Sequence, residues 1–315
     1  MTPRIKIFLI AFILALPFWW GVNIFQENLE NYFYAQISQP LEGIVFAKIP
    51  PPKPKLDLQA KAAISVKLNE SGAEKILFNK NINQPLPIAS LTKLMTAVIV
   101  LENYDLDATH PPPYTLITIS KAAANQENVP NYGNLDKYLG EKFNVEQLLD
   151  LMLVYSSNDA AWALSEVIET KNFVEKMNQK AEELGLGNTH FVNPTGLDPE
   201  NFYYHPPNQS YFNYSTAQDL LKLAQYISKN HPLIFEITLK KGPYPVENGM
   251  GDLILPENQT GIGWKTGYTD EAGGCALLVL GKENGNVLFN IILGTESQEA
   301  RIREMQKLIN YQARL

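Results

Sequence analysis

Two apolar segments near the C-terminus flank a short polar turn, and together they predict a β-hairpin. Residues 275–280 and 287–293 are apolar runs of strand length, and Asn284-Gly285 lies between them. Asn-Gly provides the left-handed backbone that a tight hairpin requires. We therefore expect an antiparallel strand pair at this end of the chain.

A second strand pair is predicted near the start of the globular part. Residues 62–68 and 75–79 are strand-like and surround the polar turn 69–72. An amphipathic helix is predicted over 299–311 and closes the chain. Strands thus occur at both ends with helices between them, and parallel βαβ alternation is absent. This order predicts an α+β fold whose antiparallel sheet is built from both chain ends.

The region between the two strand pairs is predicted to be helical. Three of its helices are expected to begin at a capping residue that is followed three positions later by Gln or Glu. These pairs are Asn144 with Gln147, Asn172 with Glu175, and Ser215 with Gln218. The first three of five helices are expected at residues 90–102, 144–154 and 158–168. The fourth begins at Asn172 and ends at Gly185 or Gly187, and the fifth begins at Ser215 and stops before Pro232.

The N-terminal segment is predicted to lie outside this globular part. Residues 7–25 are almost entirely apolar, and Arg4 and Lys6 precede them. Such a segment is a membrane-spanning anchor or a secretory signal peptide, with a buried core helix as the least favoured alternative. The nearest small residue for cleavage, Ala35, has the bulky Phe33 at −3, so we favour the uncleaved anchor. The basic flank predicts a cytoplasmic N-terminus and an extracytoplasmic remainder.

A proline-rich stretch follows the apolar segment. Pro50, Pro51, Pro52 and Pro54 predict a stiff, extended spacer, because proline cannot continue a helix or a central strand. The expected organisation is a signal anchor or signal peptide over 1–26, an extracytoplasmic linker over 27–55 and one globular domain over 56–315. This places the protein at the cell membrane, or outside the cell if the signal is cleaved.

Composition argues against several functional classes. The chain has 26 Lys and Arg against 33 Asp and Glu, a net charge of −7, which argues against a nucleic-acid partner. Cys275 is its single cysteine, which rules out an internal disulfide and a thiolate zinc site. The histidines have no local metal-binding spacing, so no metal site is expected. They are His110, His190, His205 and His231.

The first chemically suggestive motif is Ser90-Leu91-Thr92-Lys93, an S-x-x-K sequence at a predicted helix start. Residues three apart share a helix face, so the Lys93 amine can reach the Ser90 hydroxyl. A serine needs a base to become a useful nucleophile, and a lysine whose pKa is depressed by burial and nearby cations can serve. Free N–H groups at the helix start can stabilise an oxyanion.

The second motif is Ser156-Ser157-Asn158, an S-x-N sequence between two predicted helices. From a tight turn, Ser156 could relay a proton while Asn158 holds a lysine or a substrate amide. Serine and asparagine are also leading helix-capping residues. Taken alone, this motif favours the capping interpretation.

The third motif is Lys265-Thr266-Gly267, which is followed by Tyr268 and is expected on a strand of its own. Its lysine and threonine offer a cation and a hydroxyl to a substrate carboxylate, and glycine allows close approach to the backbone. The glycines in this region do not have the spacing of a dinucleotide-binding loop.

In this order, the three motifs resemble the signature of the penicillin-recognising serine enzymes. The longer strings around them are similar to those of the serine-type D-alanyl-D-alanine carboxypeptidases, the low-molecular-mass penicillin-binding proteins. These strings are residues 87–97, 156–161, 190–197 and 265–269. The resemblance covers about residues 60–312 and implies a β-lactamase/transpeptidase-like fold. That fold has a five-stranded antiparallel sheet flanked by helices, together with a helical lobe.

The resemblance also implies a reaction. Ser90 would attack the penultimate D-alanine carbonyl of a peptidoglycan stem peptide, with Lys93 as its base. Ser156 and Lys93 would pass the proton to the leaving D-alanine, and Asn158 would orient Lys93 and the substrate. Water would then release the acyl-enzyme without a cofactor.

The remaining implied roles concern substrate binding. Lys265 and Thr266 would hold the terminal carboxylate beside Gly267, and the N–H groups of Ser90 and Tyr268 would form the oxyanion hole. β-Lactam antibiotics are the implied inhibitors. The resemblance predicts a smaller residue than Trp264 directly before this strand motif. The width of the cleft therefore does not follow from the resemblance. Many relatives carry a C-terminal β domain and a tail anchor, and we expect the N-terminal anchor to replace that tail.

Three other functions remain open. A D,D-endopeptidase that cuts peptidoglycan crosslinks would use the same residues. A class A-like β-lactamase needs a deacylating glutamate on a loop, whereas Glu182 and Glu183 fall in a helical pattern. A non-enzymatic wall-binding protein is the least favoured, because all three motifs are intact.

Overall fold

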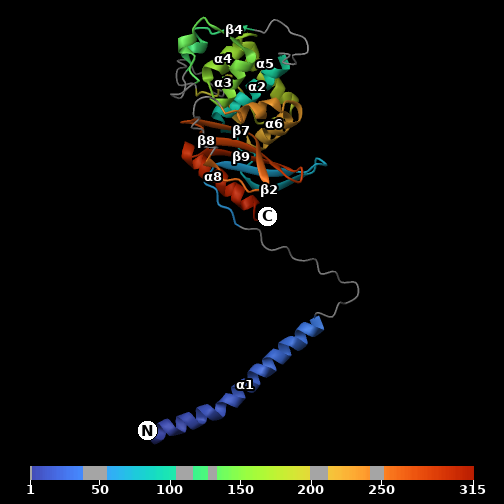
Figure 1. Cartoon of the computed structure of the whole chain (residues 1–315), viewed down its shortest axis with the longest axis vertical. Coiled ribbons are helices and arrows are strands. Elements are labelled where there is room, and N and C mark those ends of the chain that lie inside the picture. The colour runs from blue at the N-terminus through green and yellow to red at the C-terminus, as the bar shows by residue number, and fades with distance from the viewer. Residues whose placement is uncertain (1, 38–54, 104–115, 127–132, 199–211, 242–251) are drawn as a thin grey trace. The chain divides into compact units, whose positions relative to one another are not determined.

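The computed structural model describes residues 2–37, 55–103, 116–126, 133–198, 212–241 and 252–315 (Figure 1). The chain divides into two compact units, Met1–Pro52 and Lys53–Leu315. In the first, α1 (Pro3–Ile37) contains a span, Pro3–Ala35, that is long and apolar enough to cross a membrane, and an 18-residue window within it has a mean hydropathy of 2.1. A signal sequence has the same properties. The helix continues into the predicted linker, most of which lies outside the described residues.

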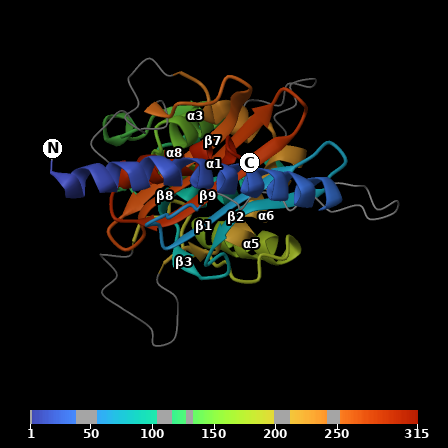
Figure 2. The ribbon, with the colours of Figure 1, turned by 90° about the horizontal axis from the view of Figure 1, so that it is seen from below.

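The second unit is built on a five-stranded sheet with the order β2-β1-β9-β8-β7, in which every neighbouring pair is antiparallel. Its strands lie side by side (Figure 2). They are β1 (Ala62–Leu68), β2 (Glu74–Lys80), β7 (Gln259–Thr269), β8 (Gly273–Lys282) and β9 (Val287–Thr295). The pairing of β1 with β9 joins the two ends of the domain, which confirms the predicted sheet. Gly285 has a φ of 71° in the turn between β8 and β9, which confirms the predicted hairpin.

Helices cover both faces of the sheet (Figure 1). α8 (Gln298–Gln312) lies on one face, and the other helices of the second unit form a lobe on the opposite face. β8 shows why its sequence is continuously apolar: Leu278 packs in the smaller core beneath α8, whereas Leu277 packs in the larger core beneath the lobe. The lobe contains α2 (Thr92–Asn103), α3 (Val145–Val154), α4 (Asn158–Glu166), α5 (Thr170–Glu183), α6 (Ala217–Asn230) and α7 (Leu233–Thr238). This confirms the α+β class.

Short elements complete the second unit. Two small ladders pair β3 (Leu86–Pro87) with β6 (Tyr214–Ser215) and β4 (Leu116–Thr118) with β5 (Lys142–Asn144). The described part of this unit also contains three single 3₁₀ turns. They are η1 (Ala89–Leu91), η2 (Ala123–Asn125) and η3 (Asp136–Tyr138).

The predicted helix starts were correct at α3 and wrong at α5. The Asn144 side chain accepts the Gln147 N–H at 2.8 Å, and the Gln147 side chain accepts the Asn144 N–H at 3.0 Å, which confirms the capping box. Helix α5 begins at Thr170, so the predicted cap at Asn172 is wrong. The helix begins directly after Glu169, whose φ is 63°, and Phe173 of its first turn is buried in the larger core.

The start of α6 differs from the prediction by one residue. Its cap is Thr216, whose hydroxyl accepts the Asp219 N–H at 3.0 Å. Ser215, the predicted cap, instead pairs with Leu86 in the small ladder of β3 and β6. A tertiary pairing, which local spacing does not encode, decides between the two adjacent hydroxyl residues.

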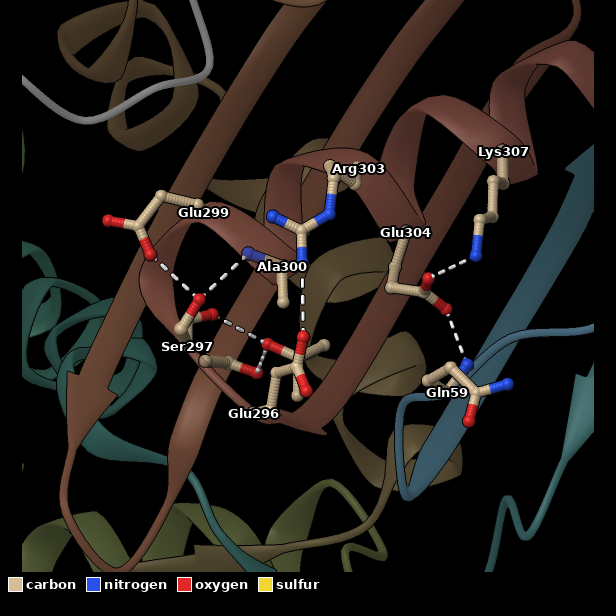
Figure 3. A network of polar contacts seen from close by, with 10 residues as sticks. Gln59, Glu296, Ser297, Glu299, Ala300, Arg303, Glu304 and Lys307 are labelled. Atoms are coloured by element: carbon tan, nitrogen blue, oxygen red, sulfur yellow. Dashed lines mark hydrogen bonds and ion pairs between the residues drawn. The ribbon is translucent and has the colours of Figure 1, made fainter.

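Contacts to α8 hold the point where the chain enters the folded domain (Figure 3). The Gln59 N–H donates to Glu304 Oε2 at 2.5 Å, and Lys307 Nζ contacts the other oxygen of this carboxylate at 2.6 Å. One residue earlier, the Leu58 carbonyl accepts Lys80 Nζ at 2.5 Å. At the helix start, the Ser297 hydroxyl accepts the Ala300 N–H. These contacts tie Leu58 and Gln59 to β2 and to α8.

Replacing Leu58 with alanine is expected to destabilise the second unit. Its side chain is 1% exposed and packs in the smaller core, so truncation removes apolar contact and leaves a cavity. We expect a loss of about 2–4 kcal/mol, or about 5–10 °C in Tm, measured by near-UV circular dichroism of the full chain in detergent. Ile254→Ala, at a side chain that is 77% exposed, is the control. Equal melting of the two variants would show that Leu58 is not a core residue.

Candidate active site

The S-x-x-K serine lies on a constrained turn. Ser90 is in the middle of η1, which leads directly into α2. The preceding residue, Ala89, has a φ of 47°, in the left-handed region that side chains other than glycine rarely adopt. Ile88 and Leu91 are fully buried on either side of Ser90 and anchor the turn in the larger core. The half-buried Ser90 hydroxyl is therefore presented from a rigid support.

Lys93 is fully buried and points at Ser90. Its Nζ lies 2.9 Å from Ser90 Oγ, 2.6 Å from Asn158 Oδ1 and 2.6 Å from the Thr195 carbonyl oxygen. Burial holds the pKa of Lys93 well below the usual lysine value, and the nearby Lys265 charge lowers it further. A lysine in this state can be neutral at moderate pH and accept the hydroxyl proton.

In the S-x-N motif, neither Ser156 nor Asn158 caps a helix. The cap of α4 is the central residue, Ser157, whose hydroxyl accepts the Ala160 N–H at 3.1 Å. The capping interpretation of Ser156 and Asn158 is therefore wrong. Ser156 has a φ of 60°, and this left-handed turn directs its hydroxyl to Lys265, whereas Asn158 contacts Lys93.

Lys265 joins the motif on β7 to the helical lobe. Its Nζ donates to Ser156 Oγ at 2.9 Å and to the Thr266 carbonyl at 3.0 Å. Burial lowers the pKa of Lys265 to about 7, and the Arg301 charge contributes in the same direction. The site thus contains two buried lysines, each bonded to a different serine hydroxyl.

Gly267 allows β7 to approach the serine turn. A Cβ on this glycine would lie 2.9 Å from the Ser90 nitrogen and 3.0 Å from the Ala89 Cβ, closer than ordinary van der Waals contact. The Gly267 carbonyl accepts Arg301 Nη1 of α8 at 2.9 Å. Tyr268, next in sequence, is 37% exposed, and Thr266 is half-buried. The eight predicted site residues therefore come from three segments that meet around Ser90 and Lys93.

Trp264 does not narrow the site. Side chains alternate along a strand, and Lys265 reaches into the helical lobe. Trp264 packs on the opposite face, against the smaller core, together with Leu253 and Leu255. The bulk of Trp264 therefore lies against the smaller core and not on the side of β7 from which Lys265 reaches Ser156.

One segment and one single residue near the site were not assigned a role from sequence. The first is the 190–197 segment, whose Thr195 carbonyl contacts Lys93. The second is Arg301, a buried guanidinium on α8. Arg301 precedes Met305 and Leu308 at helical spacing, so the periodicity of α8 could have placed it on the buried face.

Among the described residues, no group of three or more His, Cys, Asp or Glu side chains could hold a metal ion. His110 and His205 lie outside that part of the chain. Cys275 is buried on β8, as predicted, and burial raises the pKa of its thiol to about 11.

Comparison with known proteins assigns the family. The family model described as D-alanyl-D-alanine carboxypeptidase matches residues 47–297. The chain belongs to this family. The matched range includes every predicted site residue of the D-alanyl-D-alanine carboxypeptidase motifs and ends before Arg301.

Two relatives and one solved structure show the extent of the similarity. The D-alanyl-D-alanine carboxypeptidase DacF of Bacillus subtilis (strain 168) is 31% identical over 265 residues, covering 80% of this chain and 62% of that protein. The chain therefore spans less than two thirds of that relative. A D-alanyl-D-alanine endopeptidase of Pseudomonas aeruginosa is 31% identical over 242 residues, covering 73% of this chain and 71% of that protein.

The solved structure is penicillin-binding protein D2 from Listeria monocytogenes in its cefotaxime-bound form. It matches with a TM-score of 0.66 and 28% identity, covering 82% of this chain and 98% of that one. This match confirms the fold that the sequence motifs predict for the D-alanyl-D-alanine carboxypeptidase family.

Lys265 is expected to make the folded protein more stable as the pH rises from about 7 to about 8.5. Its folded-state pKa is about 7, whereas an unfolded lysine has a pKa of about 10.4. Between these values unfolding takes up a proton, so stability rises by up to about 1.4 kcal/mol per pH unit. The window ends near 8.5 because the buried Cys275 thiol contributes the opposite slope above that pH.

Lys265→Met removes the titrating group while keeping much of the side-chain volume. Denaturant midpoints for the wild type and this variant, measured at both ends of the pH window, should show a smaller rise in the variant. Identical slopes would show that Lys265 keeps an ordinary lysine pKa in the folded state.

Proposed function

We propose that this protein is a serine-type D-alanyl-D-alanine carboxypeptidase that removes the terminal D-alanine from peptidoglycan stem peptides. The observation that carries this proposal is the 2.9 Å contact between Lys93 Nζ and Ser90 Oγ, made by a buried lysine whose pKa is depressed. This pair suits a nucleophile and its base. Membership of the D-alanyl-D-alanine carboxypeptidase family supports the substrate class.

In the first half of the proposed reaction, Ser90 Oγ attacks the carbonyl of the penultimate D-alanine and Lys93 takes the hydroxyl proton. The N–H groups of Ser90 and Tyr268 stabilise the oxyanion. The close approach of Gly267 to the Ser90 backbone supports this pairing of donors.

The leaving D-alanine needs a proton and a carboxylate site. Ser156 and Lys93 deliver the proton, and Asn158, bonded to Lys93, keeps the amine oriented. Lys265 and Thr266 bind the terminal carboxylate, which stabilises the charged form of Lys265 when substrate is present. Water then hydrolyses the ester on Ser90, with Lys93 again as the base. The scheme uses side chains, backbone and water.

The direct test is release of D-alanine from a pentapeptide that ends in D-alanyl-D-alanine. The wild-type protein should release it and form a covalent adduct with a fluorescent penicillin, whereas Ser90→Ala should do neither. A well-folded wild-type protein that releases no D-alanine would contradict the proposed carboxypeptidase activity.

The alternative is a D,D-endopeptidase acting on crosslinks. It is favoured by the 31% identity to a Pseudomonas aeruginosa protein named as a D-alanyl-D-alanine endopeptidase. The same Ser90 and Lys93 would serve both reactions, so a purified crosslinked muropeptide dimer separates them. Faster cleavage of this dimer than of the pentapeptide would favour the endopeptidase.

A β-lactamase function has weaker support. Glu182 and Glu183 lie in the last turn of α5, and Glu183 contacts Lys180 at 2.6 Å, so neither has the loop position that a deacylating glutamate needs. A long-lived penicillin adduct is therefore expected. Rapid penicillin turnover would favour a β-lactamase, and binding without turnover of any substrate would favour a wall-binding protein.

We also propose that α1 anchors the protein in the cell membrane with its catalytic domain outside. The apolar span in α1 and the basic residues Arg4 and Lys6 support this orientation. The proposed divisions are an anchor over 1–26, a linker over 27–55 and a catalytic domain over 56–315. In spheroplasts, added protease should remove the domain, and protection of the domain would contradict this orientation.

A further inference from the structure

The 190–197 segment contributes to the site through a backbone group, and something must hold that group in place. The Thr195 carbonyl oxygen accepts Lys93 Nζ at 2.6 Å. A carbonyl in a turn can rotate unless its neighbours are bonded. Within the turn, Asn193 Oδ1 accepts the Thr195 N–H at 3.1 Å and the Gly196 N–H at 2.7 Å. These bonds fix the shape of the turn, but they do not attach it to the helix that carries Lys93.

Asn213 makes that attachment. Its Oδ1 accepts the Val192 N–H at 2.7 Å and the Asn193 N–H at 3.2 Å. Its Nδ2 donates to the Asn193 carbonyl at 2.9 Å and to Thr92 Oγ1 at 2.9 Å. Asn213 is 3% exposed, so its amide bonds are shielded from competing water. One side chain thus joins the turn to the first residue of α2, immediately before Lys93.

The main chain of Asn213 makes a third connection. Its carbonyl accepts the Ile88 N–H at 3.1 Å, two residues before Ser90. The serine turn, the start of α2 and the turn that carries the Thr195 carbonyl therefore all contact Asn213. Thr96, one helical turn after Thr92, adds a parallel tie through the Pro194 carbonyl at 2.7 Å.

We propose that Asn213 is a positioning residue for Lys93: it holds the Thr195 carbonyl against the lysine amine and so keeps the amine aimed at Ser90. This inference rests on the proposed function, because it assigns Lys93 the role of base. Asn213 itself touches neither the nucleophile nor the amine. Its effect passes through the 192–195 backbone.

The chain offers a matched control on the same segment. Asn178 on α5 clamps Phe191 in the same way: its Oδ1 accepts the Phe191 N–H at 2.8 Å, and its Nδ2 donates to the Phe191 carbonyl at 2.9 Å. Within the described part of the chain, the Asn178 side chain hydrogen-bonds Val174 and Phe191 and makes no hydrogen bond to α2 or to η1. Loss of either asparagine removes side-chain bonds to this backbone, but only Asn213 connects it to Lys93.

The experiment compares the wild type, Asn213→Ala and Asn178→Ala as full chains in detergent. The measurements are the rate constant of acylation by a fluorescent penicillin and kcat and KM for D-alanine release. We expect Asn213→Ala to lower acylation and kcat by about 10- to 100-fold with KM changed by less than about threefold, because misaimed groups slow chemistry more than binding. Asn178→Ala should lower Tm but keep both rates within about threefold.

A second variant covers failure of Asn213→Ala to fold. Thr92→Val removes one acceptor of the Asn213 amide with little change in volume, and we expect a decrease of about 3- to 10-fold in the same two rates. Equal rates in Thr92→Val and the wild type, or equal losses in Asn213→Ala and Asn178→Ala, would overturn the positioning role.

A readout that does not require activity separates this inference from the proposed function. In protein labelled with ¹³C-lysine, the Cε signal of Lys93 reports its surroundings and is assigned by its absence in Lys93→Met. It should shift in Asn213→Ala and Thr92→Val but not in Asn178→Ala. If the wild type is neither acylated by penicillin nor releases D-alanine, the proposed function fails. Independently of that result, a Lys93 signal that does not shift in Asn213→Ala and Thr92→Val overturns the positioning role.

Discussion

Lys93→Met is expected to abolish covalent labelling of the protein by penicillin, with the acylation rate reduced by at least about 1,000-fold. The amine is the polar group that contacts Ser90 Oγ, Asn158 Oδ1 and the Thr195 carbonyl together. Methionine fills a similar volume but cannot accept a proton. Ser90 would then lack its base while the oxyanion donors remain, so the remaining reactivity should be small.

The measurement is the second-order rate constant of labelling by a fluorescent penicillin, with Ser90→Ala as the zero reference. Lys229→Met serves as the control, because Lys229 is exposed near the end of α6, in the Ser228-Lys229-Asn230 sequence that also matches S-x-N. This control should label at the wild-type rate. Substantial labelling of Lys93→Met or Ser90→Ala would refute the assignment of base and nucleophile.

Gly196→Ala is expected to lower both stability and acylation. Gly196 has a φ of 88°, and a Cβ there would lie 2.0 Å from the Ala89 carbonyl oxygen and 3.0 Å from the Ser90 nitrogen. The left-handed backbone and the clash together should cost about 2–5 kcal/mol of unfolding free energy. Ala89 is itself left-handed, so its turn has little freedom to retreat. Displacement of Ser90 by about 1 Å should reduce acylation about 100-fold.

Gly185→Ala separates backbone strain from the clash. Gly185 has a φ of 64° after α5, and no atom lies within 4 Å of its hypothetical Cβ. This variant should lose about 1 kcal/mol and label normally. Thermal unfolding and penicillin labelling of both variants test the expectation. Normal labelling by Gly196→Ala would show that the contact between the Thr195–Gly196 turn and Ala89 does not position Ser90.

The sheet was predictable because its strands carry local signals. The Asn284-Gly285 turn and the apolar runs beside it specify a hairpin without reference to the rest of the chain. Helix starts were less predictable. Asn144 and Gln147 cap each other locally, whereas Ser215 enters a ladder with Leu86, and only the folded chain brings that partner close.

The candidate site was predictable where residues sit close together in sequence. Ser90 and Lys93 are three apart at a helix start, so their contact follows from helical geometry. The role of Asn158 did not follow from its own motif, because Ser157 beside it is an equally good cap and Lys93 is 65 positions away. The same holds for Asn213, whose tie to Thr92 spans 121 positions.

Spacing within a few residues specifies the strand pairs, the α+β order and the three motifs. How the motifs act depends instead on the packing of segments that lie far apart in the chain. Burial between the sheet and the helical lobe lowers the pKa of Lys93. The left-handed backbone conformation of Ser156 directs its hydroxyl to Lys265. Desolvation and contacts between distant segments arise only when the chain is packed, and local spacing does not encode them.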